Sequence, residues 1–218
     1  MARRIRALTV DRVADLPDPC CSCAMWELGG RAAPSCDSAH EREELRAWVE
    51  DVRAEWGECG RIVYENGETL GFVKYAPPRF FPQVISMPSG PPDSDSVLIA
   101  CLRVVDDARD AALGKVLLQA TLRDLVMRRE KAVEAYAVTR PLERDRTPLM
   151  SVEFLLRQGF AVARPHPVHP LMRLELKSLA AWTDNVEAVL DALQLPLRVR
   201  DRVPAPLVSP SKTEGARR

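Results

Sequence analysis

A short turn between an apolar run and a helical pattern carries most of the chemistry that this sequence suggests. Residues 97–105, VLIACLRVV, form a continuous apolar run with one arginine, and residues 113–131, LGKVLLQATLRDLVMRREK, have a helical apolar stripe. The first turn of a helix exposes unpaired N–H groups and a partial positive charge, which together suit an anion. Arg109 adds a cation, and Gly114 allows a phosphate to approach the backbone. The pattern predicts a phosphate cradle, although a structural turn without a ligand would show similar residues.

Three polar residues farther along the chain could take part in proton transfer. Glu134 lies within VEAYAV, residues 133–138, where a carboxylate on a covered parallel strand must be paired or line a cleft. We expect it to act as a general base toward an incoming ammonium, with a structural salt bridge as the alternative. Tyr136 shares its face and could donate a hydrogen bond at the cleft or be a core tyrosine. Ser151 could supply an acid, or could simply cap a short helix.

The turn at residues 102–118, LRVVDDARDAALGKVLL, resembles the acetyl-coenzyme A segment of the GNAT superfamily of N-acyltransferases. That superfamily has a strand, then Arg/Gln-x-x-Gly-x-Gly/Ala, then a helix. Arg109, Ala112 and Gly114 occupy the three motif positions here, with Ala112 in place of the usual first glycine. Residues 154–160, FLLRQGF, are similar to the ending of a later helix of the superfamily, aromatic-x-x-x-x-Gly-Phe.

Two further positions depart from the pattern of the superfamily. Asp106 stands where a proline is usual in the turn. Leu155, next to Phe154, stands where the superfamily often has a tyrosine that serves as general acid to the leaving thiolate. The sequence therefore offers no residue at the usual place of the acid.

The resemblance implies an enzyme that binds acetyl-CoA as acyl donor and transfers the acyl group to a primary amine by direct attack. Its pyrophosphate would lie on the N–H groups of residues 109–115, its pantetheine arm would pair with residues 102–104, and an N–H near Val104 would hold the thioester oxygen. Trp26 would wall the acceptor pocket, or would be a packing tryptophan. The implied donor-binding residues are Leu102, Arg103, Val104, Arg109, Asp110, Ala111, Ala112, Leu113, Gly114 and Lys115.

The acceptor and the biological role stay open at this point. The acceptor could be a small-molecule amine or an amine of a peptide or protein. A non-catalytic GNAT-like module that binds acyl-CoA for regulation or interaction is the main alternative function, and a dimeric scaffold without a CoA site is the third. A homodimer is compatible with each of these functions.

The elements that must position these residues follow from periodicity and turn signals. Residues 41–56 have a one-sided apolar stripe, which predicts a helix, and Asn66-Gly67 within residues 61–75 predicts a hairpin. The prolines of residues 76–96 predict a loop without a regular element. A short strand followed by a polar loop or helix start within residues 4–17, a short helix near 149–158, and strands at 97–105, 133–138, 160–163 and 171–177 complete the prediction.

The predicted fold is α/β, with a mixed, mostly antiparallel sheet that contains one parallel splayed pair and is flanked by helices. We expect a GNAT-like domain over residues 1–178, a C-terminal helix packed on it over 179–195, and a disordered, basic, proline-rich tail over 196–218.

Composition narrows the classes of function. Thirty-one basic and 31 acidic residues give a formal net charge of zero, which argues against a nucleic-acid binder. No apolar run reaches the roughly 18–20 residues that span a bilayer, and no secretory signal is seen, so we expect a cytoplasmic protein without membrane attachment. Cys20, Cys21, Cys23, Cys36 and His40 lack clear zinc-ligand spacing, so we expect buried thiols and no metal site.

Overall fold

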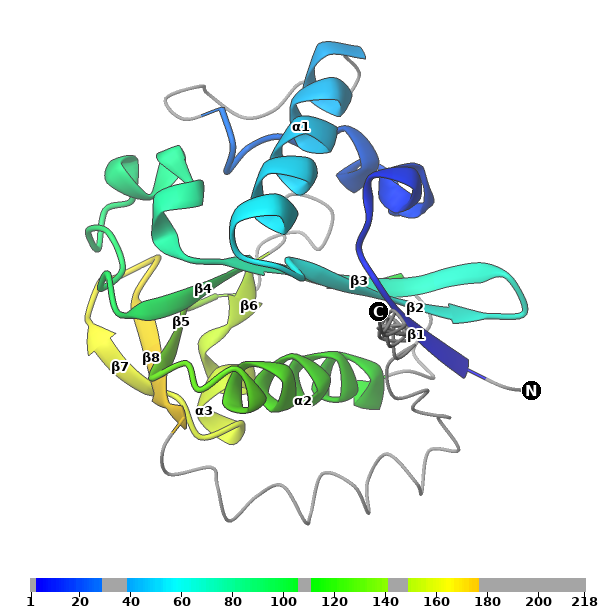
Figure 1. The fold of residues 1–218 in the computed structure, drawn as a ribbon. Coiled ribbons are helices and arrows are strands. Elements are labelled where there is room, and N and C mark those ends of the chain that lie inside the picture. The colour runs from blue at the N-terminus through cyan, green and yellow to red at the C-terminus, as the bar shows by residue number, and fades with distance from the viewer. Residues whose placement is uncertain (1–2, 29–38, 106–110, 141–148, 177–218) are drawn as a thin grey trace, which may run out of the picture.

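One mixed sheet with helices on both faces forms the fold of the computed structural model, which describes residues 3–28, 39–105, 111–140 and 149–176 (Figure 1). The strand order within these residues is β1-β2-β3-β4-β5-β8-β7, and the short β6 pairs with β5. The strands are β1 (Arg3–Ala7), β2 (Gly60–Glu65), β3 (Glu68–Ala76), β4 (Ser96–Val104), β5 (Ala132–Val138), β6 (Met150–Ser151), β7 (Ala161–Arg164) and β8 (Leu171–Glu175).

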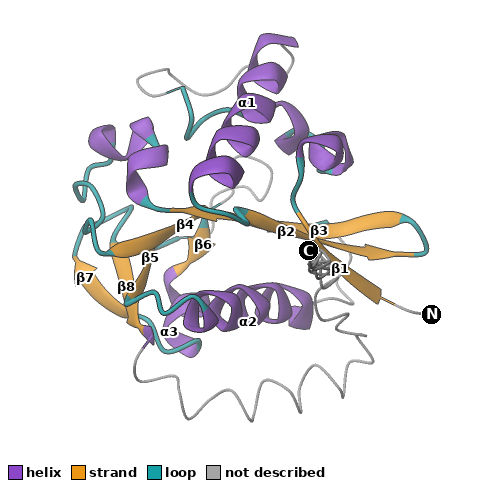
Figure 2. Cartoon of the chain, viewed as in Figure 1, coloured by secondary structure: helices purple, strands orange, loops and turns teal. Residues whose placement is uncertain are grey.

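Helices cover the two faces of the sheet in separate layers (Figure 2). One layer holds α1 (Ala39–Glu55) and four short 3-10 helices, η1 (Val10–Asp15), η2 (Cys20–Ser22), η3 (Pro78–Phe80) and η4 (Pro82–Ser86). The other layer holds α2 (Ala111–Met127) and α3 (Val152–Arg157). Each face buries its own apolar cluster, one under α1 and one under α2. The predicted fold class is therefore confirmed, because most neighbouring strands are antiparallel and β4 pairs with β5 in parallel.

The hairpin between β2 and β3 forms where the sequence predicts it. Asn66 has φ 54° and Gly67 has φ 92°, both in the left-handed region that a two-residue hairpin turn requires. Asparagine and glycine tolerate that region better than other residues do, which is why this dipeptide marks the turn.

The "Gly-Phe" ending of α3 has a local physical explanation. The N–H of Gly159 donates to Leu156 at 3.0 Å, and the N–H of Phe160 donates to Leu155 at 3.1 Å. These two bonds, with Gly159 at φ 89°, form the hydrogen-bond pattern that closes a helix through a left-handed residue. Phe160 and Leu155 lie in the same buried cluster, so the motif also fixes the end of α3 against the sheet.

Helix α2 ends earlier than the apolar pattern over residues 113–131 predicts. The N–H of Arg129 donates to Val126 at 2.9 Å and that of Glu130 to Leu125 at 3.0 Å, while Arg129 has φ 62°. The same closing pattern is thus made by an arginine in place of glycine, which propensity alone does not indicate. Arg128, Arg129 and Lys131 therefore lie at the cap of α2 and beyond it.

Two other expectations need correction. The proline-rich stretch 76–96 is not wholly irregular, because prolines at the first helical positions nucleate η3 and η4. The segment predicted as a helix near 149–158 begins as β6, which pairs with the end of β5 before α3 starts.

The predicted C-terminal helix and tail lie outside the described residues and stay predictions. Within the described part of the chain, no helix is long and apolar enough to cross a bilayer.

Candidate functional site

The parallel strands β4 and β5 are paired only where they begin. Their register joins Ser96 to Ala132 and Leu98 to Glu134, and no pair follows along the described residues. Farther along, β6 pairs with Val138 on β5. The second half of β4 therefore has β3 on one side and an unpaired edge on the side that faces away from β3.

The backbone groups at this edge can be assigned from the ladder with β3. The N–H of Val105 donates to the carbonyl of Leu70 at 2.8 Å. Backbone groups on an antiparallel strand point alternately to its two sides, so the N–H groups of Leu102 and Val104 point away from β3. Leu102, Arg103 and Val104 are also the partly exposed end of an otherwise buried strand. This end of β4 can accept an added extended chain.

A β-bulge lies next to the unpaired edge. Lys74 of β3 pairs with Cys101 and Tyr75 pairs with Ile99, so Ala100 is an extra residue on β4. Ala100 and Cys101 consequently both lie in the cluster under α1. A bulge locally bends and twists its strand, and such features are common beside active sites.

The predicted phosphate cradle is partly within the described residues. Helix α2 begins at Ala111, and the N–H groups of its first turn have no acceptor within the helix. Ala112 and Lys115 are exposed there, while Leu113 and Gly114 are buried. Arg109 and Asp110 lie outside the described residues, so their predicted contribution stays a prediction.

Gly114 has a packing function that the sequence does not reveal. A Cβ placed on it would meet Leu102 at 3.6 Å, Val104 at 3.8 Å and Phe154 at 3.9 Å. The small residue therefore lets α2 lie close to the end of β4. Ala112, which is exposed, leaves this turn open to an anion.

Glu134 is almost completely buried and engages both of its carboxylate oxygens. Oε2 accepts hydrogen bonds from the backbone N–H of Asp93 at 2.7 Å and from the Ser96 hydroxyl at 2.8 Å. Oε1 lies 3.5 Å from Nη1 of Arg173, its cross-strand partner on β8. The general-base role stays a prediction, and these contacts favour the salt-bridge alternative.

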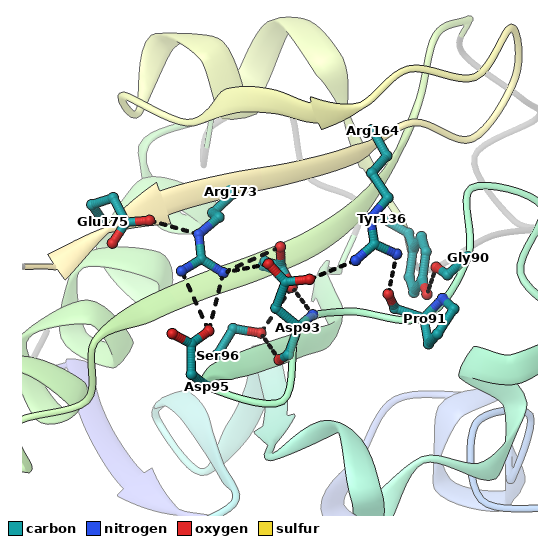
Figure 3. A network of polar contacts seen from close by, with 10 residues as sticks. Gly90, Pro91, Asp93, Asp95, Ser96, Tyr136, Arg164, Arg173 and Glu175 are labelled. Carbon is teal, nitrogen blue, oxygen red and sulfur yellow. Dashed lines mark hydrogen bonds and ion pairs between the residues drawn. The ribbon is translucent and has the colours of Figure 1, made fainter.

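Figure 3 shows how the same network ties the loop before β4 to β7 and β8. Arg173 lies 3.3 Å from Asp93, 3.4 Å from Asp95 and 2.6 Å from Glu175. Arg164 of β7 lies 2.6 Å from Asp93 and also donates to the carbonyl of Pro91. These ion pairs fix the start of β4, on the N-terminal side of the point where β4 and β5 separate.

Tyr136 and Trp26 form part of the core. Tyr136 is 1% exposed, and its hydroxyl donates to the carbonyl of Gly90 at 2.7 Å. Burial raises the pKa of its phenol above the usual range. Its ring stacks on Trp26 at a centroid distance of 5.7 Å, and Trp26 is 0% exposed. The predicted roles of the two residues at an acceptor site stay predictions, and their contacts favour the core alternative for both.

Ser151 caps α3. Its hydroxyl accepts a hydrogen bond from the N–H of Phe154 at 3.1 Å, the geometry of an N-cap. This contact gives Ser151 the structural function that was the alternative to an acid.

A buried ion pair on the α1 side was missed from the sequence. Lys74 on β3 donates to Glu27, and their side chains are 4% and 3% exposed. The ammonium lies 5.3 Å from the ring centroid of Trp48. Burial acts to lower the pKa of Lys74, but the net shift is upward, because the Glu27 carboxylate and, to a lesser extent, the nearby Cys101 and Cys23 favour the charged ammonium. A lysine within the apolar strand GFVKYA was the only available signal.

The pair lies beside the bulge, because Lys74 is the register partner of Cys101. Oε2 of Glu27 has no hydrogen-bond partner among the residues that the structure describes. The Lys74–Glu27 pair is therefore a buried and incompletely satisfied polar group beside the bulge of β4.

The cysteines of the described residues are free thiols, and all of them except the half-buried Cys23 are buried; Cys36 lies outside the described residues. Burial raises the pKa of Cys20 to about 11 and that of Cys101 above the usual thiol range. Both groups are therefore protonated near neutral pH and are poor nucleophiles. In the described part of the chain, no group of three or more His, Cys, Asp or Glu side chains could hold a metal ion.

Comparison with known proteins identifies the fold to which this arrangement of strands and helices belongs. No protein-family model and no curated protein matches the sequence. Among solved structures, YncA from Salmonella typhimurium with its cofactor acetyl-CoA is similar, with a TM-score of 0.54, 17% identity, and coverage of 81% of this chain and 95% of that one. The PaiA N-acetyltransferase from Thermoplasma acidophilum in complex with coenzyme A has a TM-score of 0.53 and 14% identity, covering 80% and 99%. The loading GNATL domain of CurA from Lyngbya majuscula has a TM-score of 0.51 and 11% identity, covering 81% and 98%.

The chain has the GNAT fold. The resemblance seen in the sequence is confirmed at the level of the fold. Strand β4, helix α2 and strand β5 follow one another in the order expected from residues 97–138, and β4 and β5 are parallel and separate after their first residues. Leu155, at the position where a GNAT tyrosine was expected, is fully buried and carries no hydroxyl.

Proposed function

We propose that this chain is an acyltransferase that moves an acetyl or related acyl group from acyl-CoA to a primary amine. The observation that carries the proposal is the unpaired edge of β4, which runs toward the exposed first turn of α2. One element offers N–H groups to an extended chain, and the other offers N–H groups and a positive dipole end to an anion. The presence of coenzyme A or acetyl-CoA in the similar PaiA and YncA structures supports the same donor class.

The residues present fit such a donor. The N–H groups of Leu102 and Val104 are available to a pantetheine arm or a thioester oxygen. The first turn of α2 at Ala111–Leu113 suits a pyrophosphate, and Lys115 lies one turn along as an exposed cation. Acyl-CoA would supply the activated thioester, and the chain would supply its position and a preorganised donor.

We propose direct attack by the amine on the donor. A route through an acylated cysteine needs a thiolate, and burial keeps Cys20 and Cys101 protonated near neutral pH. Binding the two substrates side by side can itself supply a large part of the rate enhancement. Acceptor recognition is assigned to the α1 side, near the Lys74–Glu27 pair.

A non-catalytic acyl-CoA-binding module is the second candidate. It is favoured by the apolar Leu155 at the expected acid position and by the full engagement of Glu134, Tyr136 and Ser151 in structural contacts. A chain of this kind would bind the donor with the same residues and would release no thiol.

Titration calorimetry followed by an acetylation assay separates the two functions. We expect acetyl-CoA to bind the full chain with one-to-one stoichiometry. Release of free CoA thiol should then depend on an added amine, in a panel of polyamines, amino acids, peptide N-termini and lysine peptides. Binding without amine-dependent thiol release would support the module, and absence of binding would overturn both functions.

A further inference from the structure

A basic pocket lies at the β1 edge of the sheet, beside the β2–β3 hairpin turn. It has a volume of about 520 Å³, and its lining includes Arg4, Arg6, Arg12, Asp15 and Tyr64. We call it the arginine pocket. The volume lies within the roughly 300–1,000 Å³ of small-molecule sites. β1 forms one edge of the sheet, with β7 at the other (Figure 1).

Strand alternation explains why the two strand arginines meet in one place. Arg4 pairs with Tyr64 and Arg6 pairs with Ile62, which is buried under α1. Ile5 between them pairs with Val63, which lies in the cluster under α2. Side chains two residues apart point to the same face, so both arginines emerge on the α1 side, where η1 brings Arg12.

The charges of the pocket do not balance. Three guanidinium groups face one carboxylate, and Asp15 already accepts a hydrogen bond from the Tyr64 hydroxyl at 2.6 Å. Within the described part of the chain, Arg4 and Arg6 form no ion pair, and Arg12 donates to the carbonyl of Ala7 at 3.0 Å. By contrast Arg3, on the opposite face of the same strand, is paired with Glu65 at 3.0 Å.

We propose that the arginine pocket binds a small molecule that carries a phosphate group. A guanidinium presents several donors in a fixed plane, which matches the oxygens of a phosphate, and three converging guanidinium groups suit an anion with two or more charges. The chain as a whole has no basic excess, which disfavours a nucleic-acid backbone as the ligand.

This site is separate from the proposed donor site. The pocket lies on the α1 side, whereas α2 covers the opposite face of the sheet. β1 and β4 are three strand spacings apart, which is about 14 Å. The proposal therefore does not depend on the proposed acyltransfer, and a ligand here should bind together with acyl-CoA.

Titration of the full chain with inorganic pyrophosphate tests the proposal. The salt should be about 0.1 M, where the Debye length is about 10 Å and diffuse surface attraction is weak. Arg4→Gln and Arg6→Gln should each weaken binding by about tenfold or more. Arg3→Gln is the matched control, since it removes the same charge from the other face, and its affinity should stay within about twofold of the parent.

Two further arms identify the site and the ligand class. Ala112→Glu, which places a carboxylate at the start of α2, should leave intact the pyrophosphate-binding event that Arg4→Gln and Arg6→Gln weaken, although it should remove any second event at α2. Loss of the arginine-dependent event in that variant would assign the anion to α2 and overturn the proposal. Equal loss in Arg3→Gln and Arg6→Gln, absence of binding, or binding of citrate or a hexaglutamate peptide in preference to pyrophosphate would also overturn it.

Discussion

Lys74 and Glu27 form an ion pair that is buried between the sheet and the α1 layer, next to the bulge at Ala100. The two residues are 47 positions apart in the sequence, and each side chain is at most 4% exposed. A pair in this environment depends strongly on both partners, because a charge left alone cannot be solvated.

Removal of one partner should therefore destabilise the fold more than removal of both. Lys74→Met should lower the free energy of unfolding by about 3–5 kcal/mol. The double variant Lys74→Met with Glu27→Leu should recover a large part of that loss, because no charge stays buried. Urea unfolding of the parent, both single variants and the double variant measures the coupling. Additive effects of the two substitutions would contradict this account.

Substitution of Gly114 separates packing from ligand contact. A Cβ on Gly114 would meet the neighbouring side chains at ordinary van der Waals distance. Gly114→Ala should therefore fit and should stabilise the helix by about 0.5–1 kcal/mol. A rise in melting temperature is the expected result. Gly114→Glu should instead unfold the protein, since it would bury a carboxylate beside Leu102 and Val104, and its effect on binding would then not be specific. A destabilised Gly114→Ala variant would show that α2 packs more tightly than described.

Ala112 offers a cleaner test of the donor site. Ala112→Glu adds a negative charge to the exposed first turn of α2, where it should favour the helix by about 0.3–1 kcal/mol. The same charge should repel a pyrophosphate, so affinity for acetyl-CoA should fall by about tenfold or more while the melting temperature is kept or raised. Ala112→Gln, with equal size and no charge, is the control and should bind nearly as the parent does. Equal affinities of the two variants would place the donor elsewhere.

Glu134→Gln decides between the two roles of that residue. Its carboxylate accepts from Asp93 and Ser96 and pairs with Arg173, so the substitution should lower the free energy of unfolding by about 1.5–3 kcal/mol. We expect turnover per folded molecule to change little. A fall of about 10²–10⁴-fold at unchanged stability, with loss of the acid limb of the pH profile, would instead establish Glu134 as the general base.

A buried thiol should make the stability of the fold depend on alkaline pH. Burial raises the pKa of Cys59 from 9.0 to about 12, so above pH 9 the unfolded chain releases a proton that the folded chain keeps. Since the folded state then binds more protons, the free energy of unfolding should fall as pH rises between about 9 and 12. Each such group contributes a slope of about 1.4 kcal/mol per pH unit. Cys59→Ala should reduce the slope measured by urea unfolding at pH 9.5–10.5, without changing the slope at pH 7–8.

Local patterns determined much of this protein by themselves. The Asn66-Gly67 turn, the stripe of α1, the closing motif around Gly159 and the apolar run of β4 depend on residues close in sequence, so their conformations can be read from spacing. The strand–helix–strand order over residues 97–138 also predicts the parallel pair, because such connections have a strongly preferred geometry.

Tertiary structure alone decided which charged groups are partners and which are free. Arg173 meets Glu134 across 39 positions of sequence, and Lys74 meets Glu27 across 47. A one-dimensional pattern shows a carboxylate in an apolar strand but not its counterion, since the counterion comes from a distant element. The same holds for the four arginines in positions 3–12 of the sequence. Only the pairing of β1 with β2 shows that Arg3 forms an ion pair with Glu65, whereas Arg4 and Arg6 line the pocket on the other face.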